Sequence, residues 1–343
     1  MEKLNKYYQL LPKEYADISV SFKNKKKAEC SEKLFDIISK HKIVHFLIEN
    51  QLLEISQSVQ EYLKKSVSRN FANIKEVIDI DTLLIKKNID VIHLKGISLS
   101  KILYDDISFR SIGDIDIFIK SKDLKKTTLI LKSNFYKNIE LKNTFWSLSF
   151  YKYFYYHFMF KKLDSNQLIE VHWGLSRDNF INKKYYPEIW QKAKKIDIAG
   201  YNFLTLDDEW NYIFLLVHGA IHSWYKLLWL SDLYTIVEKW TLNDWDYYEN
   251  KCRVLNIERP FYASIFLMAI FFELKYPEKY NIELIDKKID KIIKFSINSV
   301  VTDNYKESRL NKLIYLMMLK KGFLHKFNTL KYRIIRIILR FGI

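Results

Sequence analysis

The spacing of apolar residues changes twice along the chain and divides it into three regions. Through residues 27–90, apolar residues recur at the spacing of an amphipathic helix, with polar residues between them. From residue 91, short runs with strand-like alternation replace this pattern, and the helical spacing returns after about residue 205. The pattern therefore predicts a helical beginning, a mixed α/β centre and a helical end.

The clearest strand of the centre covers residues 114–119. Its residues alternate strictly, so that Asp114, Asp116 and Phe118 lie on one face and three isoleucines lie on the other. The isoleucines predict that this strand is buried on one side, while its other side carries two carboxylates. An exposed edge strand with solvated acids is the alternative interpretation.

Two further strand-like segments, residues 157–163 and 168–173, flank the polar residues 164–166 and predict a hairpin. Together these elements predict an α+β fold, in which a mixed, mostly antiparallel sheet is flanked by N-terminal helices and by a helical C-terminal domain. We expect four regions along the chain: an N-terminal helical region (1–90), an α/β core (91–204), a C-terminal helical domain (205–306) and a basic amphipathic tail (307–343).

The composition is that of a folded chain with a strong positive charge. Of its 343 residues, 49% are hydrophobic, which excludes a disordered chain, and two cysteines are too few for a disulfide framework. No export signal and no uncharged run long enough to span a bilayer are visible, so we expect a cytoplasmic protein. The net charge of +16 admits nucleic acid, anionic lipid or a polyphosphate ligand as partners. Lysines spread by AT-rich coding explain the same charge without a partner.

The paired aspartates predict a cation site. Two carboxylates held on one strand face repel each other unless a cation lies between them. Mg²⁺ suits such a pair, because it binds one or two carboxylates together with substrate phosphates. A third carboxylate, Glu170, lies in the second hairpin strand, and a position beside the first strand would bring it close to Asp114 and Asp116. Three carboxylates can hold two divalent cations.

A phosphate site is predicted next to the acidic pair. Gly96 lies where the strand-like residues 91–94 turn into a helix, and Ser98 follows it. A glycine there lets backbone N–H groups approach a phosphate closely at a helix N-terminus. Lys95 and Arg110 add positive charge to the same unit. The alternative is that Gly96 only ends a strand.

These motifs resemble a known family. Gly96 and Ser98 followed by Asp114 and Asp116 resemble the signature of the polymerase-β-type nucleotidyltransferase superfamily. More closely, the run LKGISLSKILYDDISFRSIGDIDIFI is similar to an uncharacterised bacterial nucleotidyltransferase family, as are IEVHWGL and LLVHGAIHSWYKLLWLSDL. The superfamily usually has Gly-Ser where this chain has Gly-Ile-Ser.

The resemblance implies a polymerase-β-type core and a reaction. A nucleoside monophosphate would pass from an NTP, with ATP favoured, to a hydroxyl of an acceptor, and pyrophosphate would leave, with Mg²⁺ or Mn²⁺ as cofactor. The acceptor could be a small molecule, sugar, peptide, protein or RNA. Asp114, Asp116 and Glu170 would hold the metal, with Glu170 also a candidate general base.

Several other side chains have open roles. His172 shares a strand face with Glu170 and is either an outer neighbour of the metal or a histidine satisfied within the sheet. His218 and His222 lie four residues apart on a predicted helix, where packing, lining of the active-site cleft and metal binding are all open. Lys226 lies one turn further and would line the same cleft or be solvated.

The tail has no acidic residue after Glu307, and residues 330–343 combine isoleucines with arginines at near-helical spacing. Such a basic amphipathic helix can lie on an anionic membrane surface, contact RNA or dock against the chain's own core. Two rival functions therefore stay open beside the enzyme. One is a nucleotide-binding protein without catalysis, and the other is a basic adaptor at a membrane or nucleic acid.

Overall fold

The computed structural model describes residues 4–110, 112–140, 152–165, 167–280, 286–302 and 308–341, with side chains up to residue 335. Two compact units are present, and each is discontinuous in sequence. Unit 1 comprises Met1–Leu63 and Leu215–Leu330, and unit 2 comprises Lys64–Phe214 and Lys331–Ile343. The boundaries between the units fall inside three helices.

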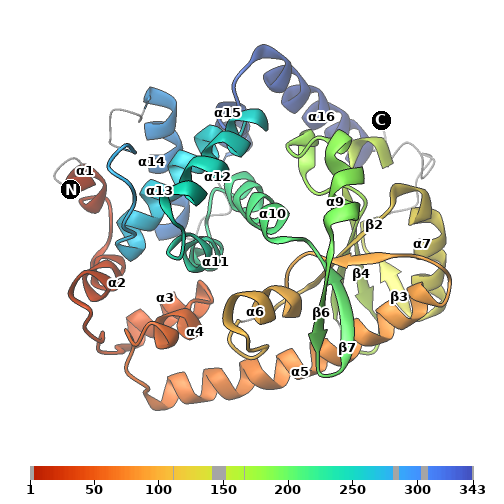
Figure 1. Ribbon diagram of the computed structural model, residues 1–343, viewed down its shortest axis with the longest axis horizontal. Coiled ribbons are helices and arrows are strands. Elements are labelled where there is room, and N and C mark those ends of the chain that lie inside the picture. Colours follow the sequence, from red (N-terminus) through yellow and green to blue (C-terminus); the bar gives the residue numbers. More distant parts are fainter. Residues whose placement is uncertain are drawn as a thin grey trace. The chain divides into compact units, whose positions relative to one another are not determined.

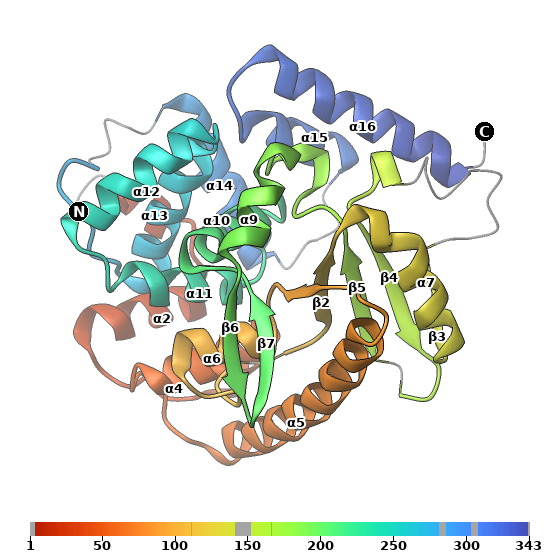
Figure 2. The same ribbon diagram turned by 45° about the vertical axis from the view of Figure 1, so that its right-hand side comes forward.

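Unit 2 contains a mixed sheet, of which Figure 1 labels β2, β3, β4, β6 and β7. In the described residues the sheet has seven strands: β1 (Val91–His93), β2 (Ile115–Ile119), β3 (Tyr136–Asn138), β4 (His157–Lys162), β5 (Leu168–His172), β6 (Lys194–Ile198) and β7 (Tyr201–Thr205). Their order is β3-β4-β5-β2-β1-β7-β6, and Figure 2 shows β2, β5, β4 and β3 side by side. Strand β2 is parallel to β5 and β1 is parallel to β7, while the other neighbours are antiparallel. The predicted α+β fold with a mostly antiparallel sheet is confirmed.

Unit 2 also contains helices that precede, connect and follow these strands in the sequence. They are the later part of α5 (Gln57–Ile85), α6 (Ile97–Tyr104), α7 (Leu124–Ser133) and α9 (Tyr186–Lys192), with short 3-10 turns η2 (Ser121–Asp123), η3 (Arg177–Asn179) and η4 (Lys183–Tyr185). The first seven residues of α10 (Asp208–Ile221) also belong to this unit. At the start of this helix, the backbone N–H of Trp210 donates to Asp207 Oδ1 over 2.8 Å.

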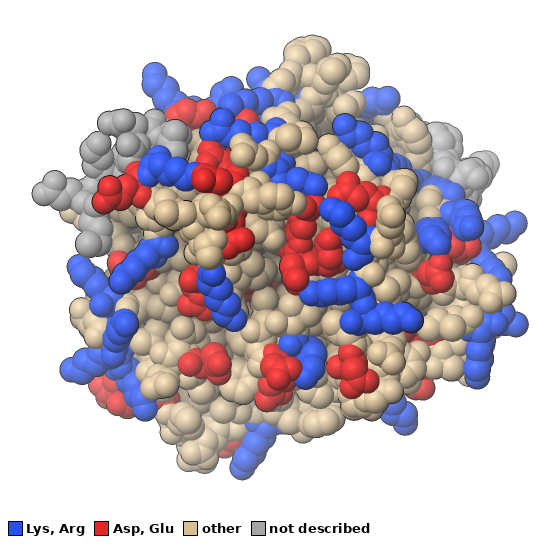
Figure 3. All heavy atoms as spheres, viewed as in Figure 1, with Lys and Arg blue, Asp and Glu red and all other residues tan. Residues whose placement is uncertain are grey.

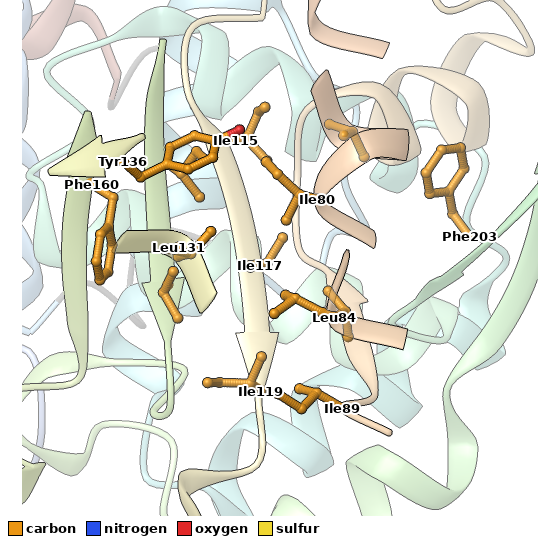
Figure 4. Close-up of a cluster of buried hydrophobic side chains, with 14 of the residues drawn as sticks. Ile80, Leu84, Ile89, Ile115, Ile117, Ile119, Leu131, Tyr136, Phe160 and Phe203 are labelled. Atoms are coloured by element: carbon orange, nitrogen blue, oxygen red, sulfur yellow. The ribbon is translucent and has the colours of Figure 1, made fainter. Parts of the chain in front are cut away.

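The apolar face of β2 fixes the strand's orientation. Ile115, Ile117 and Ile119 are buried in a cluster with residues of α5 and α7, as Figure 4 shows for Ile80, Leu84 and Leu131. Burial of each isoleucine is worth about 1.5–3 kcal/mol. A slip of one residue would move all three isoleucines out of this layer and Asp116 into it. The predicted alternation is therefore confirmed, and the acidic face of β2 points away from the core cluster.

Unit 1 is helical. Its described helices are α1 (Asn5–Tyr8), α2 (Lys13–Asn24), α3 (Glu32–Lys40), α4 (Val44–Glu49), the later part of α10, α11 (Leu227–Val237), α12 (Leu242–Val254), α13 (Glu258–Phe272), α14 (Lys287–Val301), α15 (Arg309–Met318) and the first part of α16 (Phe323–Phe341). All fifteen residues of α13 are buried, which explains its nearly continuous apolar sequence. The helices expected from the sequence after residue 205 are all present.

The last helix, α16, turns an apolar stripe toward solvent. Phe323, Phe327, Leu330 and Ile334 follow the spacing of one helix face, and all four side chains are exposed. Thr329, on the opposite side, is 1% exposed. Tyr332, also outside the stripe, packs its ring on Tyr153 and Phe154. Among the described residues, no helix combines the length and the apolar character that crossing a bilayer needs.

Charge is distributed without strong segregation on the face shown in Figure 3. Lysine and arginine atoms lie among aspartate and glutamate atoms there, and many of them are close to an opposite charge. This mixture matches the interpretation of the net charge as mainly compositional. Local clusters of charged side chains are therefore a better guide to function than the net charge of the chain.

Candidate functional site

Three carboxylates meet where β2 and β5 run side by side. The two strands are parallel, and Asp116 lies directly opposite Glu170 in their register. Asp114 precedes β2 by one residue. One carboxylate oxygen from each of these three residues lies within 4.8 Å of the other two. The structure thus brings together the three acids that the sequence placed on neighbouring strands.

A buried lysine partly neutralises these acids. Lys95 follows β1, and its Nζ lies 3.0 Å from Asp116 Oδ1, with side-chain exposures of 9% and 2%. Burial alone would discharge the ammonium, but attraction to Asp116, Asp114 and Glu170 outweighs it and raises the pKa of Lys95. Lys95 therefore serves as an internal counter-ion of the acidic site.

His172 also lies between the carboxylates. Its Nε2 is 3.2 Å from Glu170 Oε2 and 3.4 Å from Asp116 Oδ1. Burial opposes protonation, but the nearby carboxylates of Asp116 and Glu170 prevail and raise the pKa of His172 to about 9. Burial likewise opposes the charge on Glu170, yet His172 and the neighbouring cations lower its pKa to about 2. His172 thus contacts two of the candidate metal ligands.

Sequence reasoning missed His157. It lies directly opposite His172 in the β4–β5 pair, and the two rings stack with centroids 5.0 Å apart and planes 17° apart. Its Nδ1 lies 3.6 Å from Glu170 Oε2. Burial, followed by the charge of His172, lowers the pKa of His157 to about 4. Only the register of the predicted hairpin could have placed His157 here.

The glycine turn has the conformation that a phosphate site needs. Gly96 has φ +70° and is the N-cap of α6, so the N–H groups of the first helical turn are open to a ligand. A Cβ at Gly96 would make only ordinary contacts, so the left-handed backbone is what requires glycine. Ser98 is fully buried, and its Oγ has no hydrogen-bond partner among the described residues.

A small pocket joins the turn to the acids. It has a volume of about 10 Å³, room for a water-sized group, and Asn73, Lys95, Gly96, Asp114 and Asp116 are among its lining residues. Both amide atoms of Asn73 are buried without a partner in the described part of the chain. Nothing in the sequence singled out Asn73, since it lies within the long helix α5 and belongs to no motif.

Arg110 is held in the loop that leads to β2. Its side chain is buried, and its backbone carbonyl accepts a 2.9 Å hydrogen bond from Asn70 Nδ2. The same amide nitrogen donates to Ile107 O over 2.9 Å, and Asn70 Oδ1 accepts from the N–H of Ile112. Asn70 therefore fixes the path of the loop from α6 to the acidic strand.

An aromatic pocket of about 390 Å³ lies at the C-terminal end of β2, and Phe118, Ile119 and Lys120 are among its lining residues. Phe118, two residues after Asp116, is itself buried and stacks on Trp190 with ring centroids 5.3 Å apart. Trp173 and Tyr186 also line it, and Lys120 places its Nζ 4.9 Å from the Trp190 ring. Its size and aromatic lining suit a small organic ligand.

The acidic site has the ligands that a divalent cation requires. Three carboxylates form an all-oxygen donor set of the kind that Mg²⁺ and Mn²⁺ bind. Asp116 Oδ1 is buried, and although Lys95 and His172 are close to it, neither meets it with hydrogen-bond geometry. A buried carboxylate oxygen in this state has coordination capacity to spare.

The remaining predicted residues lie in unit 1. His218 and His222 pack their rings on Trp229, with centroid distances of 5.0 and 5.3 Å. Lys226 Nζ donates to the backbone carbonyl of Lys40 over 3.0 Å. Packing contacts are thus present for both histidines, and their lining of a cleft stays a prediction.

Comparison with known proteins places this geometry in a family. Residues 31–273 match a family described as uncharacterised nucleotidyltransferase. No curated protein and no solved structure matches the chain. The matched segment contains β1, the glycine turn, both acidic strands and the helices through α13. Because the match covers well over half of the sequence, the chain belongs to this nucleotidyltransferase family.

Proposed function

We propose that the protein transfers a nucleoside monophosphate from an NTP, with ATP favoured, to a hydroxyl of an acceptor. In this reaction the acceptor hydroxyl releases its proton to water, its oxygen bonds to the α-phosphorus, the bond from that phosphorus to the bridging oxygen breaks, and pyrophosphate leaves with the electron pair. The observation that carries the proposal is the convergence of Asp114, Asp116 and Glu170 beside a glycine-led helix N-terminus. Membership of a nucleotidyltransferase family supports it.

Asp114, Asp116 and Glu170 would hold Mg²⁺ or Mn²⁺. When bound, the metal supplies charge stabilisation at the transferring phosphoryl group and at the leaving pyrophosphate. Glu170 has a pKa lowered to about 2, so it is ionised and ready to serve as a ligand at neutral pH. The same low pKa makes it a weak proton acceptor, which favours the role of ligand over that of general base.

The residues around Gly96 would bind the triphosphate. N–H groups at the start of α6 favour an anion, and Gly96 leaves their approach open. Lys95 already lies among the acids as their counter-ion, so a triphosphate arriving with its metal would compete for the same ammonium. Ser98 offers a buried hydroxyl nearby, and Arg110 adds a guanidinium to the loop.

The aromatic pocket is the place we propose for the acceptor or the nucleotide base. Phe118 lines this pocket two residues after Asp116, so a ligand in the pocket would lie at the end of the strand that carries the acid. Aromatic rings stack on any flat ring, so this pocket alone selects no particular base or acceptor.

Asp114→Asn is the direct test of the catalytic proposal. Asp114 is partly exposed and precedes the strand, so its replacement should leave the fold intact. We expect transfer of label from α-labelled ATP into components of a cell extract to fall roughly 10³-fold, since a metal ligand supplies several kcal/mol. Asp105→Asn is the matched control, because Asp105 is 89% exposed and pairs only locally with Lys101. Equal transfer by Asp114→Asn and the control would contradict the proposal.

A nucleotide-binding protein without catalysis predicts a different result. Calorimetry would then show Mg²⁺-dependent ATP binding that Asp114→Asn weakens, while no pyrophosphate is released with any extract. The presence of all three carboxylates favours the enzyme over this alternative.

We also propose that α16 contacts an anionic membrane surface. Its apolar stripe is exposed, and the described part of the helix carries Lys326, Lys331 and Arg333 without an acidic residue. Apolar residues with flanking cations are the pattern of an interfacial helix. We expect co-flotation with phosphatidylserine vesicles that is lost in Phe323→Ser/Phe327→Ser and with neutral vesicles. Vesicle binding without any NTP binding would favour an adaptor instead.

A further inference from the structure

A second group of side chains beside the acids has the composition of a transition-metal site. We infer that His157, Glu170 and His172 bind a divalent cation that prefers imidazole, such as Zn²⁺ or Co²⁺, in preference to Mg²⁺. One donor atom from each of the three lies within 4.8 Å of the other two. This second site is separate from the proposed catalytic site, except that Glu170 belongs to both.

The distances fit coordination to one cation. Glu170 Oε2 lies 3.2 Å from His172 Nε2 and 3.6 Å from His157 Nδ1. Zinc–nitrogen and zinc–oxygen bonds of about 2.1 Å place neighbouring ligand atoms about 3.0–3.5 Å apart in tetrahedral or octahedral geometry. The two donor pairs that include Glu170 Oε2 therefore lie within a few tenths of an ångström of coordination spacing, and the nearly parallel imidazole rings would turn toward the cation.

The sheet holds these donors in place. His157 and His172 are directly opposite each other on antiparallel strands, and Glu170 lies two residues before His172 on the same strand face. Tyr156 packs on both imidazoles, with ring centroids 4.3 Å from His157 and 5.8 Å from His172. Ligands fixed by neighbouring strands lose little conformational freedom when a cation binds.

The histidines also have unused donor capacity. Nδ1 of His157 and Nδ1 of His172 are buried and make no hydrogen bond with the described residues. Buried ring nitrogens normally have a partner, and a site that leaves two of them without one needs an explanation. For His157, the unpartnered nitrogen is the one that lies toward Glu170.

The donor set determines which metal fits. Two imidazoles and one carboxylate suit Zn²⁺ and Co²⁺, whereas Mg²⁺ and Mn²⁺ prefer oxygen. The acidic site next to it is all oxygen, so the two sites would select different cations. Glu170 would then offer one oxygen to each site. Three protein ligands leave a fourth position for water or a substrate group.

Cobalt titration of the metal-free full-length protein tests this site without any assay of activity. We expect Co²⁺ to give visible absorption bands that Zn²⁺ abolishes and that excess Mg²⁺ leaves in place. His157→Phe keeps the ring stack on His172 but removes a ligand, and we expect it to weaken Co²⁺ binding roughly 100-fold or more. His157→Gln, which retains a polar group, provides a second variant should the first fail to fold.

His222→Phe is the matched control, because His218 and His222 also pack their rings against each other, with centroids 4.8 Å apart. We expect it to leave the cobalt bands unchanged. Bands that persist in both His157 variants, or that disappear in His222→Phe, would overturn the inference. Asp114→Asn should keep the bands even though it removes nucleotidyl transfer. Transfer reports on the acidic site and the cobalt bands report on the histidine site. Each proposal can therefore fail without the other, and the two measurements show which one has failed.

Discussion

Two glutamates in this protein have the same low pKa in different surroundings. Glu249 in unit 1 accepts hydrogen bonds from Tyr262 over 2.7 Å and Tyr280 over 2.9 Å, and Arg253 also donates to it. Burial opposes its charge, but these donors lower its pKa to about 2. Glu170 in unit 2 reaches a similar pKa among other carboxylates and two histidines.

The difference lies in what surrounds each carboxylate. Glu249 faces donors only, so its environment is complete and its role is structural. Glu170 lies close to Asp114 and Asp116, and the group includes buried atoms without hydrogen bonds. A shifted pKa therefore does not by itself identify a functional site. A more specific sign of a functional site is a group of closely spaced carboxylates with buried oxygens that make no hydrogen bond.

The largest stability effect should come from Asp116→Asn. The substitution leaves the buried Lys95 ammonium without its closest partner, and such a change costs about 3–5 kcal/mol. Urea unfolding should show this loss, while Asp114→Asn should lose transfer at almost unchanged stability. If Asp116→Asn were as stable as wild type, Lys95 would not be the counter-ion of the site.

Glu249→Gln should lower stability less than Asp116→Asn does, and it should leave nucleotidyl transfer unchanged. Weakened hydrogen bonds to Tyr262, Tyr280 and Arg253 should lower the free energy of unfolding by about 1–3 kcal/mol. ATP binding and label transfer should be unchanged at a temperature where the variant is folded. A specific loss of transfer would show that this glutamate is more than structural.

The stability difference between wild type and Glu249→Gln should depend on pH. The pKa of Glu249 is about 2 when folded and near 4.5 when unfolded, so its contribution is complete above pH 4.5 and is lost as the pH falls toward 2. Urea midpoints of the two proteins should therefore converge between about pH 4.5 and pH 3. Parallel curves over this range would contradict the assigned cause.

Magnesium should stabilise unit 2 modestly. Binding at about ten times the dissociation constant adds about 1.4 kcal/mol, which should raise the melting temperature by a few degrees. Glu249→Gln should retain this shift, and Asp114→Asn should lose it. An equal shift in both variants would place the cation elsewhere.

The smallest effect should come from Asp105→Asn. Asp105 is exposed and forms an (i, i+4) pair with Lys101, so the expected change in unfolding free energy is below about 0.5 kcal/mol. Thermal melting in low and high salt would measure it. A larger loss of unfolding free energy would show that this solvent-exposed ion pair contributes more to stability than such pairs usually do.

The sequence predicted the elements of the site better than their pairing. Strict alternation in β2 identified its buried isoleucines and its acidic face, because a period of two has one interpretation in a strand. The hairpin of β4 and β5 was also predicted, but its register was not, since that depends on turn geometry. The position of His157 beside Glu170 was missed for this reason.

The hairpin of β6 and β7 was missed for a different reason. Its two-residue turn consists of Ala199 and Gly200, both with positive φ, and alanine is an unusual residue in that conformation. Asn73 gave no signal either, because a helical asparagine becomes informative only when its amide is seen buried without a partner. Packing context, which no single sequence contains, decides both cases.

The parallel pairing of β2 with β5 has a consequence for synthesis. A parallel pair cannot form as a local hairpin, so Asp116 waits for a distant part of the chain before it meets Glu170. A nascent chain that ends before β5 has only the aspartate pair, and slow non-local pairing must follow once β5 emerges. The acidic centre is therefore completed late, and an unfinished polypeptide on the ribosome lacks its third carboxylate.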